Sequence, residues 1–248
     1  MLRIDHLVVN IDKKYQTEQI EIQSIRNSLL PYEPKWGKGT KGFKASNIWI
    51  GNEYLEMIHL LKKDGGGWKS EWVEKYNNGH RGPICLMLDV DNLDQIYEEM
   101  INNYSINISE PQYLQFKWGF GLFTRTMPWR NSYFPFFEGI PLQIGLQQMK
   151  DEKSAKLMQQ YMVPNARDNG INGMAEIKIK GPLTESDFEL INTIFKTKES
   201  IDNGVVIYLN HNQKLFFEYA DEYNVEITTS SKNVKPSEVE IENILISI

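Results

Sequence analysis

One short pattern recurs along this chain at nearly constant spacing, and it constrains the fold more than any other feature. An aromatic residue, a leucine or phenylalanine, and a glutamate follow one another at Tyr54–Glu56, Phe136–Glu138 and Phe216–Glu218. The glutamates lie 82 and 80 residues apart. Units repeated at a fixed spacing indicate a duplicated architecture, although so short a triplet also recurs by chance.

The first two triplets fall in the last strand of a series of one apolar strand, one amphipathic helix and further strands, and the third falls within a similar series, as judged from hydrophobic periodicity and turn residues. In the first copy we expect a strand at 2–11, a helix at 14–29 and strands at 44–50 and 53–60. In the second we expect a strand at 83–90, a helix at 92–103 and strands at 112–117, 120–127 and 132–138. In the third we expect a strand at 174–179, a helix at 184–196, and strands at 204–209, 214–220, 223–229 and 238–247.

These series predict an α+β fold built from repeated βαβββ modules. The domain boundaries that we expect are two paired modules over 1–148, a helical linker over 149–171 and a third βαβββ-like module over 172–248. The third module is expected to be structural, either packing on the first two or forming a homodimer contact.

The composition excludes several classes of protein. Of 248 residues, 41% are hydrophobic and 24% charged, which is typical of a chain with a real core. The net charge of −6 argues against nucleic acid as the main partner, because phosphate binding needs a basic surface. Cys85 is the single cysteine, and no apolar run is long enough to cross a membrane. We therefore expect a cytoplasmic protein that does not bind membranes.

The opening of the chain resembles glyoxalase-like domains of the vicinal-oxygen-chelate superfamily, which includes glyoxalase, bleomycin-resistance proteins and extradiol dioxygenases. The likeness rests on Ile4–Val9, Gly39–Thr40 and Tyr54–Glu56 in the first module, and on Leu88–Asp94 and Phe134–Glu138 in the second. It covers residues 1–145 well. The resemblance implies paired modules whose curved, mixed sheets form an open, barrel-like cleft. It also implies a divalent metal in that cleft, held by residues of the first and last strands of each module.

His6 and Glu56 match the ligand positions of the first module, and Glu138 corresponds to Glu56 in the second. His6 and Glu56 each interrupt an apolar strand face, where an ionisable group needs a partner or a ligand. One imidazole and two carboxylates suit Zn, Mn, Fe, Ni or Co without deciding among them.

The fourth ligand that the resemblance implies is missing. Only Cys85 stands near the position that matches His6, and a soft thiolate would be unusual in such a site. Cys85 fits a buried core residue better. The alternative for His6 and Glu56 is that they hydrogen-bond each other or the backbone inside the cleft.

Aromatic residues crowd into positions 113–137, and ordinary packing explains most of them. Small-molecule pockets are nevertheless lined mainly by apolar and aromatic groups with a few polar anchors. We expect substrate-binding roles for these residues: Trp36, Trp118, Phe136, Arg125 and Arg130. The two arginines would act as carboxylate clamps, and Trp36 would cover the pocket mouth.

Two functions follow from these features. The first is a metal-dependent lyase, isomerase or dioxygenase acting on a small oxygenated compound, with Glu138 moving a proton. The second is a metal-free protein that binds or sequesters a small molecule. A scaffold without a ligand is a third interpretation.

Overall fold

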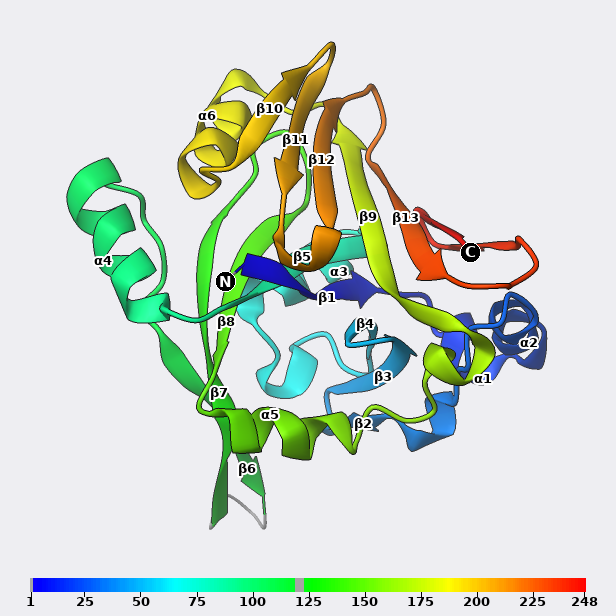
Figure 1. Cartoon of the computed structure of the whole chain (residues 1–248). Coiled ribbons are helices and arrows are strands. Elements are labelled where there is room, and N and C mark those ends of the chain that lie inside the picture. Colours follow the sequence, from blue (N-terminus) through cyan, green and yellow to red (C-terminus); the bar gives the residue numbers. More distant parts are fainter. Residues whose placement is uncertain (1, 119–122) are drawn as a thin grey trace.

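The computed structural model describes residues 2–118 and 123–248; the side chains of 38, 116–118, 123 and 125 lie outside that description. The strands form two mixed sheets, seen together in Figure 1. Six α-helices accompany them within the described residues: α1 (Lys14–Thr17), α2 (Gln19–Asn27), α3 (Ser70–Asn77), α4 (Leu93–Tyr104), α5 (Glu152–Gln159) and α6 (Glu185–Ile194). None of these described helices combines the length and the apolar character needed to span a membrane.

The first sheet, sheet A, has eight strands in the order β2-β3-β4-β1-β5-β8-β7-β6. The central strands β1 and β5 run antiparallel, and each lies parallel to the last strand of its own half, β4 or β8. The bounds are β1 (Leu2–Asn10), β2 (Lys38–Gly39), β3 (Phe43–Ile50), β4 (Glu53–Leu60), β5 (Gly82–Val90), β6 (Gln112–Trp118), β7 (Phe123–Phe136) and β8 (Gln143–Met149). Two βαβββ modules are joined in this way into one mixed sheet, so the predicted α+β fold class of paired βαβββ modules is confirmed.

The second sheet, sheet B, has seven strands in the order β10-β11-β12-β9-β13-β15-β14. The bounds are β9 (Ile171–Gly181), β10 (Lys198–Ile201), β11 (Gly204–Tyr208), β12 (Lys214–Tyr219), β13 (Asn224–Ser231), β14 (Glu238–Ile241) and β15 (Ile244–Ser247). Its pairing repeats that of sheet A: β9 takes the place of β1, β12 that of β4, and β13 that of β5. β15 runs parallel to β13 as β8 does to β5. Sheet B is therefore a complete module followed by a shortened one.

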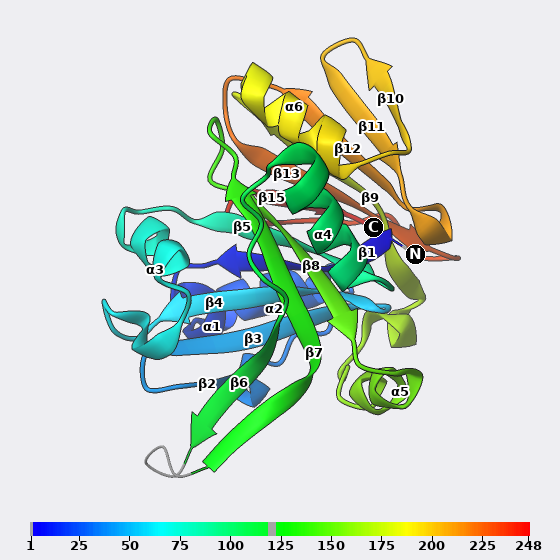
Figure 2. The ribbon, with the colours of Figure 1, turned by 90° about the vertical axis from the view of Figure 1, so that its left-hand side faces the viewer.

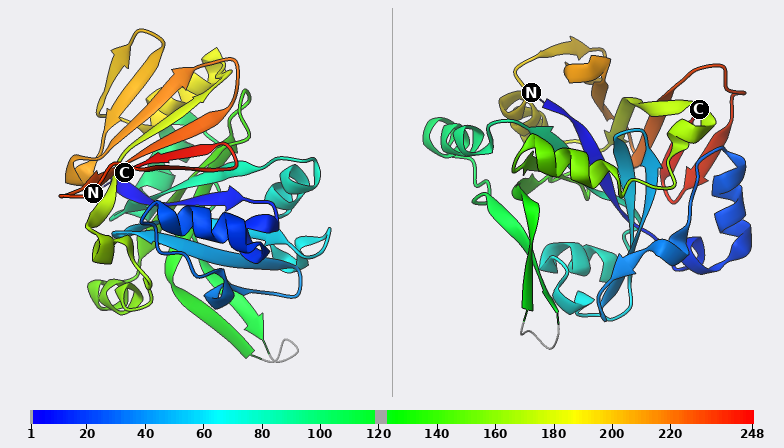
Figure 3. Two further views of the ribbon diagram at one scale, coloured as in Figure 1. Left: turned by 90° about the vertical axis from the view of Figure 1, so that its right-hand side faces the viewer. Right: turned by 60° about the horizontal axis from the view of Figure 1, so that its bottom comes forward.

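The two sheets share one hydrophobic core. Leu55 and Met57 of sheet A belong to the same buried cluster as Ile177 and Phe217 of sheet B. Helices α1, α2, α4 and α6 all contribute to this cluster. Figure 2 shows α4 and α6 on one side of the molecule, and the left view of Figure 3 shows α1 and α2 against β3 and β4. This face of sheet A is therefore covered by the shared core and its helices.

The opposite face of sheet A has its own, smaller cluster. Val8, Ile58, Cys85 and Met87 pack there against Trp72 of α3. No sequence pattern predicted α3, because Gly65–Gly67 and the polar residues after it resemble a flexible linker. The helix covers only part of this face, so the rest of it remains available for a ligand.

The second module differs from the prediction at its end. Residues 123–127 of the first expected run and 132–136 of the second belong to one long strand, β7, and the last strand of the module, β8, was not predicted. Residues 120–122 lie outside the described residues. Pro128 suggested a break, but it lies where the β6–β7 register shifts, so its missing N–H interrupts no regular ladder. Three glutamines and a glycine among the seven residues of β8 made its sequence less apolar than that of an ordinary buried strand.

Candidate functional site

The open face of sheet A carries side chains from alternate positions of its central strands. Across the sheet, Tyr133 of β7, Met87 of β5, His6 of β1 and Tyr54 of β4 stand in one row of the register. Glu56 lies next to Val8 in the adjoining row. These side chains point away from the shared core.

This face is concave. In a flat sheet β4 and β7 would lie about 19 Å apart, four strand spacings. Nevertheless Ala45 of β3 and Tyr133 of β7, on opposite sides of the central strands, pack against the same cluster on this face. The side chain of Gln147 on β8 also reaches over β5 to donate a hydrogen bond to Asp5 on β1, at 3.1 Å. Sheet A therefore curls around this face, which we call the hollow.

Three ionisable side chains form a line in the hollow. The Asp5 carboxylate and Nδ1 of His6 lie 2.5 Å apart, and the second imidazole nitrogen, Nε2, lies 4.0 Å from the Glu56 carboxylate. Asp5 reaches this side because the β1–β5 register shifts between Ile4 and His6, which places two neighbouring side chains on one face. The carboxylate of Asp5 fixes the orientation of the imidazole.

The 4.0 Å gap between His6 and Glu56 is too long for a hydrogen bond. It leaves room for an atom of a ligand to contact both side chains. The side chain of His6 is 7% exposed, that of Asp5 16% and that of Glu56 24%. The more accessible end of the line is therefore Glu56.

Burial raises the pKa of the Glu56 carboxyl, His6 partly offsets that rise, and Asp5 adds to it. A carboxyl held in this way exchanges its proton closer to neutral pH than an ordinary glutamate does. The ring of Tyr54 stacks on His6 with centroids 4.4 Å apart. Burial raises the pKa of Tyr54 well above its ordinary value, so the phenol stays neutral.

A groove of about 710 Å³ opens beside this cluster, between the segment before α3 and strands β6 and β7. Tyr133 belongs to both, because it lines the groove and interacts with Glu56. Burial raises the pKa of the Tyr133 phenol far above its usual range, and Asn131 donates a hydrogen bond to its oxygen at 3.1 Å. The lining residues are Lys69, Ser109, Glu110, Gln112, Tyr113, Leu114, Gln115, Asn131 and Tyr133.

Glu138 does not join His6 and Glu56. It lies beyond the end of β7, exposed, and accepts hydrogen bonds from Thr184 and Ser186 at the start of α6, at 3.5 and 3.4 Å. The strand parallel to β5 is β8, so the position that corresponds to Glu56 is Gly145, opposite Met87. The predicted convergence of the three side chains is therefore wrong for Glu138, because the last strand of the module was misassigned.

The predicted metal centre does not fit the donors that the hollow provides. In the second module, Cys85 stands at the position equivalent to His6, and Gly145 at the position equivalent to Glu56. Burial raises the pKa of Cys85 far above its usual range, and its thiol donates to Met87 Sδ at 3.5 Å, so it is a core residue. Among the described residues, no group of three or more His, Cys, Asp or Glu side chains is arranged to hold a metal ion. His6 and Glu56 alone would leave most coordination positions without protein ligands.

The predicted substrate-binding residues are dispersed. Arg130 is held by Asp94 through two hydrogen bonds of 2.8 and 2.7 Å, so its charge is already paired. Phe136 packs in the cluster beneath α3, with the ammonium group of Lys75 4.3 Å from its ring. The side chains of Arg125 and Trp118 lie outside the described ones.

Trp36 is 58% exposed and lines a different depression, of about 340 Å³, beside Tyr32 and Pro164. It therefore does not cover the groove of sheet A.

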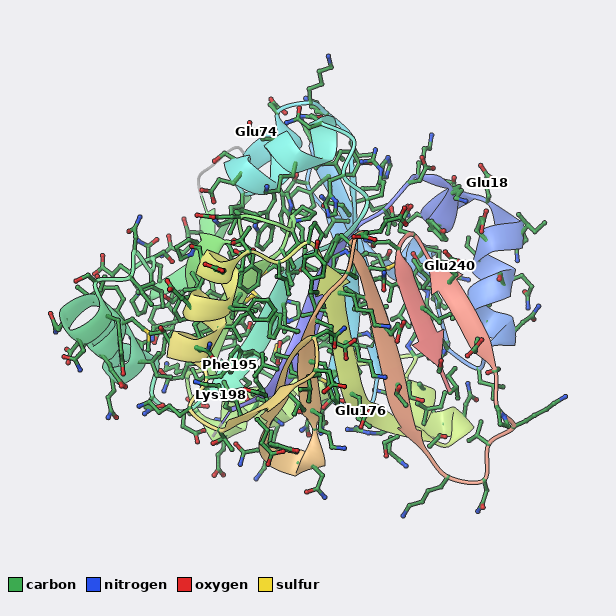
Figure 4. All side chains as sticks on the ribbon, turned by 90° about the horizontal axis from the view of Figure 1, so that it is seen from above. Glu18, Glu74, Glu176, Phe195, Lys198 and Glu240 are labelled. Atoms are coloured by element: carbon green, nitrogen blue, oxygen red, sulfur yellow. The ribbon has the colours of Figure 1, made fainter. Side chains whose placement is uncertain are left out.

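Sheet B has no counterpart of the His6–Glu56 pair at the equivalent positions. Glu218 matches Glu56, as the repeated triplet predicted, but Lys178 stands where sheet A has His6. This face of sheet B carries surface ion pairs, such as Lys214 with Glu176 at 3.1 Å. Figure 4 looks down on sheet B and labels Glu176 on β9.

Sequence reasoning missed the roles of Asp5, Gln147 and Asn131. Asp5 precedes His6 directly, and simple alternation places two neighbours on opposite faces. The only signal was two consecutive polar residues in an apolar strand. A bulge that turns both to one face cannot be read from that signal.

Comparisons with known proteins support the fold and go no further. No protein-family model and no curated protein matches the chain. The crystal structure of a hypothetical protein from Staphylococcus aureus aligns over 100% of this chain and 98% of its own, with a TM-score of 0.72 and 11% identity. The chain is also similar to methylmalonyl-CoA epimerase from Streptomyces coelicolor over 60% of its length and 98% of that chain, with a TM-score of 0.40 and 12% identity. The corresponding enzyme from Mycobacterium tuberculosis aligns with a TM-score of 0.39 and 10% identity, over 62% of this chain and 91% of its own. We draw no functional conclusion from likeness at these levels.

Proposed function

We propose that this chain is a small-molecule-binding protein of the vicinal-oxygen-chelate superfamily that holds its ligand in the hollow of sheet A without a metal centre built from its side chains. The observation that carries this proposal is the line of ionisable side chains Asp5, His6 and Glu56 on a concave face. A gap of 4.0 Å separates His6 from Glu56 in this line. Polar groups that converge beside aromatic walls are typical of a ligand site. The adjoining groove of about 710 Å³ lies within the size range of such pockets.

The proposal is tested by thermal unfolding of the purified protein. We expect members of a library of small aromatic compounds to stabilise the wild type, because a ligand stabilises the state it binds. Zn²⁺, Mn²⁺, Ni²⁺ and EDTA should have no comparable effect. Glu56→Gln should abolish the response to the compounds, while Glu218→Gln, the same change at the equivalent position of sheet B, should keep it.

Two results would overturn the proposal. One is stoichiometric metal in the purified protein that is lost on His6→Ala. The other is compound binding that is identical in the wild type and in Glu56→Gln.

A second candidate, proton transfer as in an isomerase or lyase, is favoured by the raised pKa of Glu56 beside an imidazole oriented by Asp5. In such a step the Glu56 carboxylate removes a proton from a carbon next to a carbonyl group and returns it to the same carbon. In D₂O this chemistry replaces the hydrogen with deuterium, which NMR detects. Exchange by the wild type that falls at least a hundredfold in Glu56→Gln supports the enzyme; equal, uncatalysed rates leave only binding.

A further inference from the structure

We propose that the ligand of the hollow is an organic cation, an aromatic compound that carries a protonated amine. This inference rests on the proposed function and specifies the chemical class of the ligand. It follows from which charges at the site are already paired and which are not.

Among the described side chains, three basic groups near the site are paired with acids. Arg3 donates two hydrogen bonds to Asp89, at 2.8 and 2.6 Å. Lys69, at the groove, contacts Glu71 at 2.5 Å. Arg130 is engaged by Asp94, as described above. An anionic ligand would therefore have to break an existing ion pair to gain a partner among these residues.

The acidic side chains are in the opposite situation. Among the described residues, the one basic group within ion-pair distance of Glu56 is the His6 imidazole, at 4.0 Å, and Nε2 of that buried ring makes no hydrogen bond there. Glu110, on the groove wall, is exposed and has no cationic partner in the described part of the chain. A carboxylate on a partly buried surface gains most from a ligand that brings the opposite charge.

Aromatic rings lie near both carboxyl groups. Tyr133 lines the groove, and Tyr54 stacks on the imidazole of His6 deeper in the hollow. The protein's own ammonium group already occupies such a position, since Nζ of Lys69 lies 4.9 Å from the centroid of Tyr133. Ring faces of this kind attract cations, and an aryl group fits the same walls. The site therefore provides for both parts of an aryl-alkyl amine.

The test is isothermal titration of the wild-type protein with matched probes. Each set has the same ring and differs only in its polar end: 2-phenylethylamine, 2-phenylethanol and 3-phenylpropionate, together with the naphthyl and indolyl equivalents. We expect the amines to bind at least tenfold more tightly than the alcohols, and the carboxylates to bind most weakly. In Glu56→Gln the preference for the amine over the alcohol should fall at least tenfold, while Glu218→Gln should retain it.

The possible outcomes separate this inference from the function on which it rests. Alcohols or carboxylates that bind as well as amines, with affinity lost in Glu56→Gln, overturn the cation preference and leave the ligand site standing. An amine preference that persists in Glu56→Gln places the charge recognition elsewhere and also overturns the inference. No binding by any member of the three sets overturns the inference and the proposed ligand site together.

Discussion

Glu53 is a buried carboxyl group at the junction of the two sheets. It begins β4 of sheet A and is 7% exposed. Its two oxygens accept hydrogen bonds from the Met174 backbone N–H of β9, at 3.0 Å, and from the Gln213 side chain, at 3.1 Å. Gln213 also accepts from the Ile4 backbone N–H, so this network ties β1 and β4 to sheet B. Burial raises the pKa of Glu53 from 4.5 to about 7.

This shift predicts how stability depends on pH. The folded state binds the Glu53 proton more tightly than the unfolded state does, so the contribution of this proton is fully present below pH 4.5 and is lost as pH rises through about 7. A difference of two to three pKa units corresponds to about 3 kcal/mol of unfolding free energy. Glu53→Gln removes the titration. The amide of the new glutamine also faces the Met174 N–H and the Gln213 side-chain amide, both of which are donors. This lowers the unfolding free energy by about 1–3 kcal/mol at every pH.

The assay is urea unfolding of the wild type and Glu53→Gln at pH 5, 6, 7 and 8 at constant ionic strength. Between pH 5 and 8 the wild type should lose about 3 kcal/mol more stability than the variant does. Other carboxyl groups with raised pKa values, such as Glu56 and Asp89, titrate in both proteins and cancel in the difference. Glu176→Gln, the same charge change on the surface of sheet B, serves as the control. Parallel pH profiles for the wild type and Glu53→Gln would refute the reasoning.

Three further changes test the packing, the joint between the sheets and the status of Arg130. Phe217→Ala empties a fully buried position in the shared core and should lower the unfolding free energy by about 3–5 kcal/mol in a denaturant titration; a loss below 1 kcal/mol would contradict that packing. Asp187→Ala leaves the backbone N–H groups of Glu138, Gly139 and Thr184 without their acceptor and should cost at least about 2 kcal/mol, whereas a neutral effect on the melting temperature would mean that solvent replaces these bonds. Arg130→Ala removes a partly exposed ion pair with Asp94 and a hydrogen bond to Gln148, so stability should change by about 1 kcal/mol and amine affinity should stay within twofold by titration; a large loss of affinity would return Arg130 to the site.

Much of the secondary structure was predictable because local pattern decides it. β1 is a mostly buried strand, as its apolar and β-branched residues predict, and Thr184 with Asp187 caps α6 as the sequence indicated. The equivalence of Tyr54–Glu56 and Phe216–Glu218 also holds in the register of the two sheets. The third triplet copy, Phe136–Glu138, has no such equivalence, because a short motif does not reveal which strand pairs with which.

By itself, the sequence determined the strand–helix–strand order, the α+β class and the apolar strand faces on which His6 and Glu56 stand, since periodicity reports which face a side chain takes. Only the tertiary structure decided which side chains meet. A register shift brings Asp5 beside His6, the curl of sheet A brings Tyr133 near Glu56, and the path after β7 carries Glu138 to α6. Each of these depends on contacts between segments far apart in the chain, and a pattern read along the chain holds no information about the distance between such segments.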